Sequence, residues 1–230
     1  MKYSLLFVVG ALLFVQFAHA LPHMKRESVA VEIAQSHNSV HHSVDSSSEE
    51  DTPEAQLIVY TLAEIAKLAT WILERGSVVV KNTVKELKEI PVKDELLQAN
   101  ITRMSEVAKE SSEFTLTADE EGVLKLLMYM VNFATMMDDY ENMPADSKLK
   151  HTLQTALENN GYARFESDFE EKVIQLAKDF DKAFGEYVKV LSPAEKVKQA
   201  KLLKWYDDFK AETDEEKKLD KFGEFFDHLS

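Results

Sequence analysis

A row of large apolar residues in the C-terminal half of the chain is the feature that most constrains its fold. The members of the row are Phe165, Phe169, Val173, Leu176, Phe180, Phe184, Tyr187 and Leu191. Successive members lie three or four residues apart, which places them on one face of an α-helix, whereas a strand would divide them between two faces. The spacing predicts one long amphipathic helix, whose aromatic face must be covered by other helices.

A second long helix is predicted upstream of this one. Thr52 and Pro53 have the residue types of a helix cap and a first turn, and Pro91 ends the apolar pattern. Gly76 lies inside the pattern, where a glycine costs about 1 kcal/mol relative to alanine, and we expect one helix that continues through it. The apolar positions of this helix are Ile58, Leu62, Ile65, Ala69, Ile72, Val79, Val80, Val84, Leu87 and Ile90.

Capping signals divide the rest of the chain into shorter helices. We expect helices over residues 92–114, from the box Thr117–Glu120 to about 137, and over 145–158, the last ending at Gly161. The boxes Ser192–Glu195 and Thr213–Glu216 predict two more. The inward positions of these two are expected to be Val197, Ala200, Leu203, Tyr206, Phe209, Leu219, Phe222, Phe226 and Leu229.

The composition agrees with a helical fold. The chain has 6 Gly and 5 Pro among its 230 residues, which is few for an all-β protein with its many turns. We therefore predict an all-α domain over residues 52–230, a single antiparallel bundle of six or seven helices. No linker that would separate two domains interrupts this range.

The N-terminal part of the chain predicts export. Residues 1–20 combine Lys2, an apolar run over residues 5–17 and a small-x-small triplet ending at Ala20, which is typical of a secretory signal peptide. Residues 21–51 are polar and aperiodic, so we expect a disordered acidic arm rich in Ser and His. Cleavage removes one of 27 basic residues and leaves 26 against 41 acidic ones, a net charge of −15. Such a charge disfavours nucleic acid and anionic membranes as partners.

Three places in the sequence are candidates for modification or processing. Asn100 begins an N-glycosylation sequon and should face solvent, because its neighbour Ile101 is an expected core residue. Ser46, Ser47 and Ser48 precede acidic residues and are candidate phosphorylation sites, the alternative being an ordinary solvated tail. Lys25-Arg26 is a candidate dibasic cleavage site or simply two charges.

No motif in the sequence predicts catalysis. The chain has no Cys, which excludes thiolate metal sites and Cys nucleophiles, and the helical region has only His151 and His228 as imidazoles. His37, His41 and His42 lie in the expected arm, where a metal would lack the surrounding partners that fix real sites. We therefore expect a protein that is not an enzyme and that has no metal site and no cofactor.

Two classes of function remain. The protein could be a secreted effector that acts by contact with another protein or a cell surface. Alternatively, it could carry a fatty acid or another small apolar ligand, because aromatic and Met side chains adapt to such ligands and bundles hold them between helices. The candidate lining residues are Phe165, Phe169, Phe180, Phe184, Met130 and Met137. An ordinary dry core would have the same pattern.

The layout resembles that of a known group of proteins. A signal peptide, a short Ser- and acid-rich segment over Ser46 to Glu50 and a Cys-free body of Lys- and Glu-rich helices are similar to the secreted salivary proteins of blood-feeding flies, in particular the 34 kDa type. The resemblance implies release into a host and modulation of host defence or haemostasis, without catalytic residues. At 26.2 kDa the chain is smaller, and helical carriers such as nematode fatty-acid and retinol-binding proteins have a similar layout.

Overall fold

The computed structural model of the protein describes residues 52–117 and 120–228. These residues form eight α-helices, one 3-10 helix and no strand, which confirms the predicted all-α class. In chain order the helices are α3 (Pro53–Lys88), α4 (Glu95–Glu113), α5 (Glu120–Glu141), α6 (Lys148–Asn159), α7 (Tyr162–Val190), α8 (Pro193–Lys198), α9 (Ala200–Ala211), α10 (Glu215–Gly223) and the 3-10 helix η3 (Glu224–His228).

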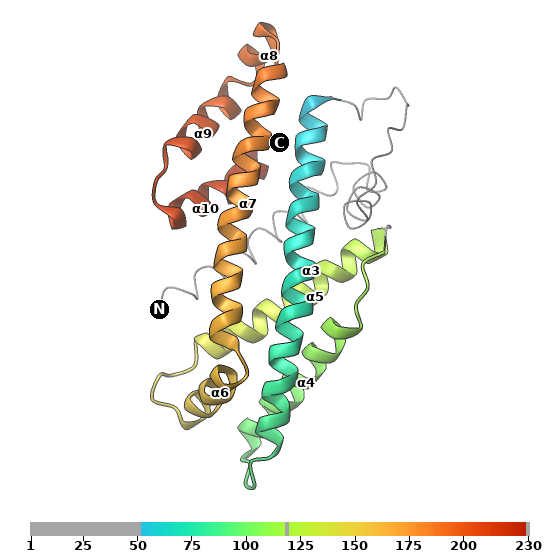
Figure 1. Ribbon diagram of the computed structural model, residues 1–230, viewed down its shortest axis with the longest axis vertical. Coiled ribbons are helices and arrows are strands. Elements are labelled where there is room, and N and C mark those ends of the chain that lie inside the picture. Colours follow the sequence, from blue (N-terminus) through green and yellow to red (C-terminus); the bar gives the residue numbers. More distant parts are fainter. Residues whose placement is uncertain (1–51, 118–119, 229–230) are drawn as a thin grey trace.

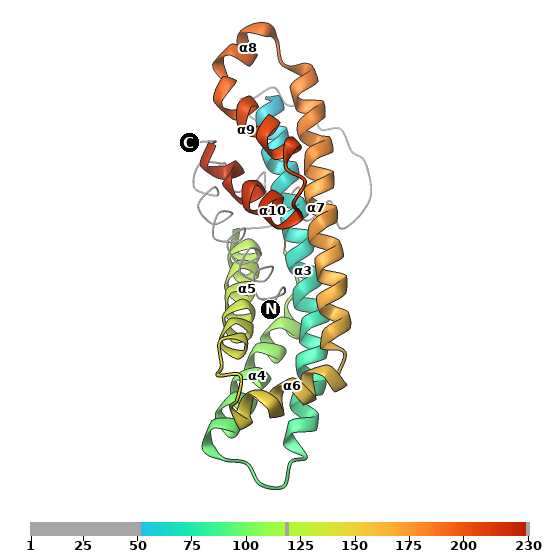
Figure 2. The same cartoon turned by 90° about the vertical axis from the view of Figure 1, so that its left-hand side faces the viewer.

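The two longest helices, α3 and α7, form the axis of an elongated molecule. They pack side by side in antiparallel directions, and each runs along much of the long axis (Figures 1 and 2). Near the C-terminal end of α3, α4 and α5 pack against one side of it, and α6 contacts both α3 and α7. The last helices fold back onto the other half of α7. The two halves of the bundle are therefore joined by α3 and α7.

The predicted passage of one helix through Gly76 is confirmed. Thr52 caps α3 by accepting a hydrogen bond from the backbone N–H of Ala55 at 3.2 Å, and Pro53 stands in the first turn. Gly76 is buried where α5 crosses α3, and a Cβ built on it would lie 2.4 Å from Cζ of Phe133. The glycine therefore allows α5 to approach α3 closely, which offsets its low helix propensity.

Part of α3 is as apolar as a membrane-spanning helix. Among the described residues, α3 is the one helix long and apolar enough to cross a membrane, and 61% of the relevant window is buried inside the molecule. A core helix of a bundle has the same properties, since a helix that is covered on several sides is apolar on several sides. Its burial accounts for its hydropathy without a bilayer.

The aromatic row predicted over α7 is confirmed. All eight members are at most 7% exposed, so the row is the buried face of the helix. Gly161, at φ 89°, separates α6 from α7 in the left-handed conformation that the sequence predicted for this turn. The antiparallel turn thus brings the start of α7 back alongside α3.

The predicted sixth helix is wrong in one respect, because it is divided in two. The capping box of Ser192 and Glu195 is present, but α8 ends after one turn and a half, and the chain bends at Gln199 before α9 begins. Val197 is 77% exposed and Ala200 is also exposed, although both were expected to face the core. Gln199 is held by two side chains: it accepts a hydrogen bond from the Tyr187 hydroxyl and donates one to Glu54 at 3.0 Å. This bend accounts for the eight α-helices where at most seven were expected.

The C-terminal end differs from the prediction in its caps and spacing. The N-cap of α10 is Asp214, which accepts from the N–H of Lys217 at 3.1 Å, and not Thr213. Phe222 is followed in the core by Phe225, because η3 has the shorter repeat of a 3-10 helix. The predicted inward positions Phe226 and Leu229 lie outside the side chains that the structure describes.

Loss of the α8 cap is expected to lower stability. Ser192→Ala removes the oxygen that accepts from the N–H of Glu195 at 3.3 Å, and N-cap losses of this kind cost about 1 kcal/mol. In a chain of this size that corresponds to a fall in Tm of about 2–4 °C. Differential scanning calorimetry measures it, with Ser167→Ala on the exposed face of α7 as control. Equal Tm values for both variants would contradict the role of the cap.

Candidate functional site

Phe180 lies at the centre of a closed aromatic cluster between α7, α9, α10 and η3. Its ring is 1% exposed. The centroids of five other rings lie 4.7 to 6.0 Å from its own: those of Phe184, Trp205, Phe209, Phe222 and Phe225. Most of these pairs have the edge-to-face geometry that aromatic rings prefer. Protein rings therefore occupy the space around Phe180 and Phe184.

The six residues predicted to line a ligand cavity are all buried but do not form one group. Phe165 stacks on Trp71 at 5.5 Å and meets the edge of Phe133 at 6.2 Å, in the half of the molecule where α5 crosses α3. Along α7, Phe165 and Phe184 are separated by about 28 Å at 1.5 Å per residue. Met130, Met137 and Phe169 are at most 4% exposed. Neither of the two clefts described below is lined by any of the six. The ligand-lining role stays a prediction.

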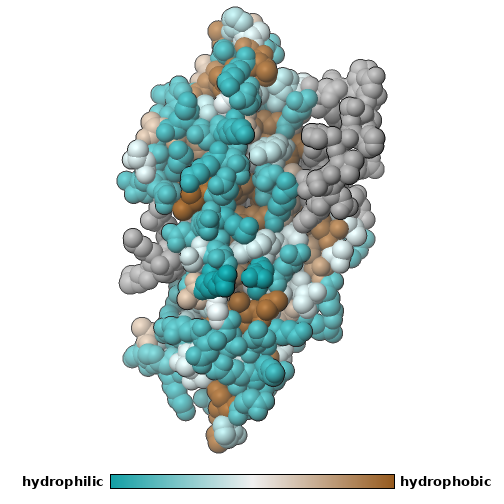
Figure 3. Space-filling view, in the orientation of Figure 1, coloured by the Kyte–Doolittle hydropathy of each residue, from teal (hydrophilic) through white to brown (hydrophobic). Residues whose placement is uncertain are grey.

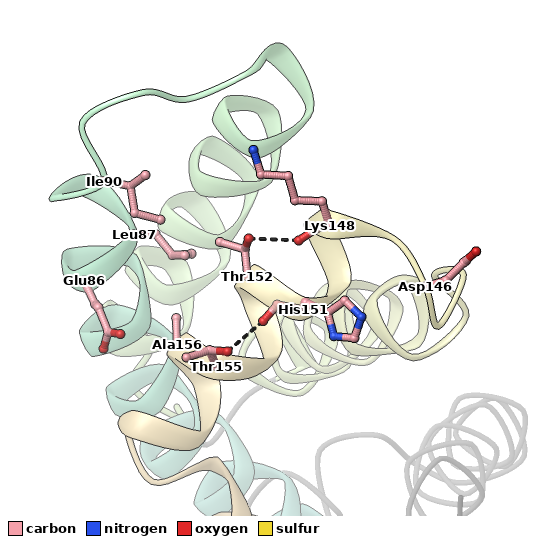
Figure 4. Close-up of a pocket in the computed structure, with 9 residues that line it drawn as sticks. All are labelled: Glu86, Leu87, Ile90, Asp146, Lys148, His151, Thr152, Thr155 and Ala156. Carbon is pink, nitrogen blue, oxygen red and sulfur yellow. Dashed lines mark hydrogen bonds between the residues drawn. The ribbon is translucent and has the colours of Figure 1, made fainter.

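The first cleft, of about 600 Å³, lies between the C-terminal end of α3 and α6. Figure 4 shows that its titratable groups do not converge: His151 lies on the side of Asp146, and Glu86 lies on the opposite wall. The hydroxyls of Thr152 and Thr155 donate to carbonyls of their own helix at 2.9 Å. Such a cleft offers no pair of groups arranged for proton transfer.

Glu86 has partners of its own in this first cleft. Its carboxylate accepts hydrogen bonds from the side-chain amides of Asn159 at 2.8 Å and Asn160 at 2.6 Å, which tie the end of α6 to α3. Its hydrogen bonds therefore fix the α6–α7 turn. The second imidazole, that of His228, lies on η3 beside the ring of Trp205. It is therefore on a different element from His151, which belongs to α6. Within the described ranges, no group of three or more His, Asp or Glu side chains is arranged to hold a metal ion.

The second cleft, of about 320 Å³, lies between α7 and the turn that joins α9 to α10. Its apolar lining consists of Ile174, Ala177 and Leu219, and Lys178 and Lys218 are the basic residues that line it. Asp181, Glu212 and Glu215 also line it. The volume lies at the lower end of the range for small-molecule sites, and apolar, basic and acidic side chains all line the cleft.

A group of tyrosines and carboxylates lies where α5, α6 and α7 meet. The rings of Tyr140 and Tyr162 contact edge to face at 6.3 Å. Burial raises the pKa of Tyr140 to about 12 and raises that of Tyr162 as well. The Tyr162 hydroxyl is buried without a hydrogen bond of standard geometry, although the Glu166 carboxylate is within range to interact with it. Burial raises the pKa of Glu166, the interaction with the Tyr162 hydroxyl partly opposes this rise, and the nearby charges of Glu141 and Glu158 add to it.

This raised pKa predicts a pH-dependent gain from Glu166→Gln. A carboxyl whose pKa is raised by folding binds more protons in the folded chain than in the unfolded one, so it lowers stability as pH rises above its usual value of 4.5. The penalty grows as the pH rises from 4.5 through the raised pKa, and Gln removes it. We expect a higher Tm for Glu166→Gln at pH 7 and a difference that shrinks towards pH 4, measured by calorimetry.

The control for this prediction is Glu171→Gln on the exposed side of the same helix. It removes a charge of the same sign without changing the buried corner. A difference for Glu166→Gln that stays constant with pH, or that matches Glu171→Gln throughout, would contradict the argument from burial.

The outer face of α5 carries three exposed apolar side chains in register. Leu124, Met128 and Val131 are 49%, 50% and 49% exposed, and their spacing of four and three places them on one line of the helix. We call these three residues the α5 row. The face of the molecule in Figure 3 is largely hydrophilic, with scattered apolar patches. Val123, Leu127 and Met130 are buried on another face of the same helix, and the exposed row beside them was not among the features predicted from the sequence.

The glycosylation candidate Asn100 lies in the middle of α4. Its side chain is partly buried and its Nδ2 donates to the carbonyl of Leu96 at 2.9 Å, while the Thr102 hydroxyl donates to Gln98 at 3.0 Å. Ile101 is buried, as expected. Glycosylation of Asn100 stays a prediction.

Several predicted features lie outside the described residues. They are the signal peptide over residues 1–20, the arm over residues 21–51, the Lys25-Arg26 pair, the histidines His37, His41 and His42, and the serines Ser46, Ser47 and Ser48. Residues 118–119, which lie between Thr117 and Glu120 in the predicted capping box, are also outside the described residues.

Comparison with known proteins gave no relationship on which to base a function. No family model matches the chain, and no curated protein and no solved structure matches it. The function must therefore be inferred from the residues and surfaces described above.

Proposed function

We propose that the protein is an exported, non-enzymatic binding protein that acts by contact with another protein. The observation that carries this proposal is the α5 row, since exposed apolar side chains that lie together on a polar surface are characteristic of contact sites. The signal-like residues 1–20 support export, and the excess of acidic residues favours a partner with a basic surface.

The surroundings of the titratable groups support a non-enzymatic role. In the first cleft Glu86 is bound by two asparagine side chains, and His151 lies on the opposite wall. In the second cleft Asp181 accepts a hydrogen bond from the Tyr206 hydroxyl at 2.8 Å. Catalytic acids and bases need to approach a substrate and one another, whereas Glu86 and Asp181 are bound by other side chains and His151 lies apart from Glu86.

Affinity capture tests the proposal. The mature chain, immobilised through its C-terminus, is incubated at low salt with the fluid or tissue that it meets after secretion. We expect a protein partner in stoichiometric amount, released as salt rises because screening weakens the contact between opposite charges. Capture of no protein at low salt would contradict the proposal.

The setting in saliva is part of the same proposal and depends on the resemblance in layout. It predicts transcripts concentrated in the salivary gland and the cleaved chain in the secreted fluid. Mass spectrometry of that fluid should find an N-terminus at Leu21 or after Arg26. Expression confined to another tissue would contradict the salivary setting and leave the binding role to be tested separately.

A carrier of small apolar molecules is the second candidate, and the second cleft favours it. Ile174, Ala177 and Leu219 would contact an apolar chain, and Lys178 or Lys218 would contact a carboxylate. Native mass spectrometry of protein from a lipid-rich source tests this role. It predicts an added mass that Lys178→Gln with Lys218→Gln reduces, and the bare mass of the chain with no ligand added would contradict it.

A further inference from the structure

The α5 row extends over a short length of one helix. From Leu124 to Val131 the helix rises about 10 Å at 1.5 Å per residue, and each of the three side chains is about half exposed. Beside the row, the rings of Tyr129 and Phe114 meet at 5.6 Å and remain partly exposed in the seam between α5 and α4. The apolar contact area therefore has the width of one helix or extended segment, and it is too small for two folded domains, which bury about 800 Å² each.

Carboxylates surround this apolar row. Asp138 is exposed on the same face of α5, about two turns beyond Val131, and Glu121 is exposed one turn before Leu124. Two side-chain hydrogen bonds join α4 to α5 and mark the edge of α4 that faces α5. They link Arg103 to Asp139 and Asn132 to Glu110.

Two of the basic groups near the row are already paired. Glu106 lies between Arg103 and Glu110 on that same edge of α4 and is exposed. Arg103 forms an ion pair with Asp139, and Lys125 forms one with Glu121 at 2.6 Å. Each of these ion pairs is neutral, so among the described residues the carboxylates of Glu106, Glu110 and Asp138 outnumber the one remaining ammonium group, that of Lys109 on α4, and the net charge around the row is negative.

The geometry points to the α5 row as the docking site for a basic amphipathic helix of the partner protein. Such a helix places apolar side chains at positions i, i+3 or i+4, and i+7 against the row. Its Lys and Arg side chains reach the carboxylates of Glu106, Glu110 and Asp138. A second copy of this acidic chain would bring like charges together, and an anionic membrane would repel the same carboxylates. The inference rests on the proposed function and specifies the surface and the kind of partner.

The test uses a defined peptide and the mature chain. The probe is a fluorescent helix built from Leu and Lys with Leu at i, i+3, i+4 and i+7, and a scrambled peptide of identical composition controls for charge. Fluorescence anisotropy gives the two affinities. With methyl-labelled Met, the NMR signal of Met128 should shift on binding while that of buried Met130 stays nearly unchanged.

Charge-neutral variants test the location of the contact. We expect the double variant Leu124→Ser with Met128→Ser to weaken binding of the Leu/Lys helix by at least about tenfold, as for central apolar contacts in other interfaces. The matched control, Val190→Ser with Val197→Ser, changes two exposed apolar residues near α8, 64% and 77% exposed, and should leave the affinity unchanged. Glu106→Gln with Asp138→Asn should reduce both the affinity and its dependence on salt.

Several outcomes would overturn the inference. They are equal affinity for the ordered and scrambled peptides, an affinity that the Leu124 and Met128 changes leave intact, or a dimer of the mature chain that those same changes dissociate. A natural partner still captured equally by the double variant would overturn this docking site and leave the proposed function standing. A failure to capture any partner would overturn the proposed function itself.

Discussion

Phe180→Ala is expected to destabilise the protein more than any other single substitution discussed for it, by about 3–5 kcal/mol. The loss combines the transfer of a large apolar side chain with the cavity that remains, because five surrounding rings cannot all move inward. Their centroids lie 4.7 to 6.0 Å from that of Phe180. Urea denaturation followed by fluorescence measures the change, with Trp205 in the cluster as reporter in a Trp71→Phe background.

A matched control accompanies this measurement. Val197→Ala also removes part of an apolar side chain, but Val197 is 77% exposed, so its free energy of unfolding should change by no more than about 0.5 kcal/mol. A loss below about 1 kcal/mol for Phe180→Ala would contradict a closed cluster, because cavity formation in a packed core costs more than that.

The second large effect is expected at Gly76. Gly76→Ala would place a Cβ 2.4 Å from Cζ of the buried Phe133 ring, which forces α3 and α5 apart or the ring out of place. Overpacking of this kind costs about 1–3 kcal/mol, and alanine's better helix propensity, worth about 1 kcal/mol, offsets part of it. We expect a net loss of about 1–2 kcal/mol after that offset, measured as a shift in the urea midpoint.

Two further variants separate the contact from helix propensity. Gly223→Ala introduces a Cβ with no atom within 4 Å and should be neutral or slightly stabilising. Phe133→Leu in the Gly76→Ala background removes the ring atoms that the new Cβ meets, so the two losses should be less than additive. Additive losses would show that Gly76 and Phe133 are not coupled.

The sequence was most informative where a periodic pattern was long. The row on α7 predicts its buried face correctly, because eight positions at helical spacing average out local deviations. α3 was predicted as one helix for a similar reason, although the sequence did not explain Gly76. The structure explains the glycine by the close approach of Phe133, which lies 57 residues further along the chain (133 minus 76). A pattern of neighbouring residues in the sequence does not reveal a contact over this separation.

Short elements were predicted less well. The bend at Gln199 depends on side chains from Tyr187 and Glu54, so tertiary contacts overrule a continuous helical pattern there. In the 3-10 helix η3, Phe225 is buried three residues after Phe222, whereas the spacing of an α-helix predicted a step of four. A change of helix type over five residues leaves no clear trace in periodicity.

The α5 row could have been recognised in the sequence as apolar residues beyond those that one buried helix face needs. Leu124, Met128 and Val131 follow directly after the buried residues Val123, Leu127 and Met130, so the sequence contains two parallel apolar stripes on one helix. One buried stripe suffices for packing, and the second therefore suggests a contact surface. Which stripe stays exposed depends on how α5 packs against α3 and α4, which the sequence alone does not determine.

Photo-crosslinking tests the central claim, that this protein acts by contact with another protein through α5, most directly. A photoreactive amino acid is placed at position 128, or at the exposed control position 197, in the mature chain, which is then irradiated in the fluid that it meets after secretion. The account predicts one protein adduct of defined mass from position 128 that is absent from position 197. Adducts that are equal at the two positions, or no protein adduct at position 128, would contradict it.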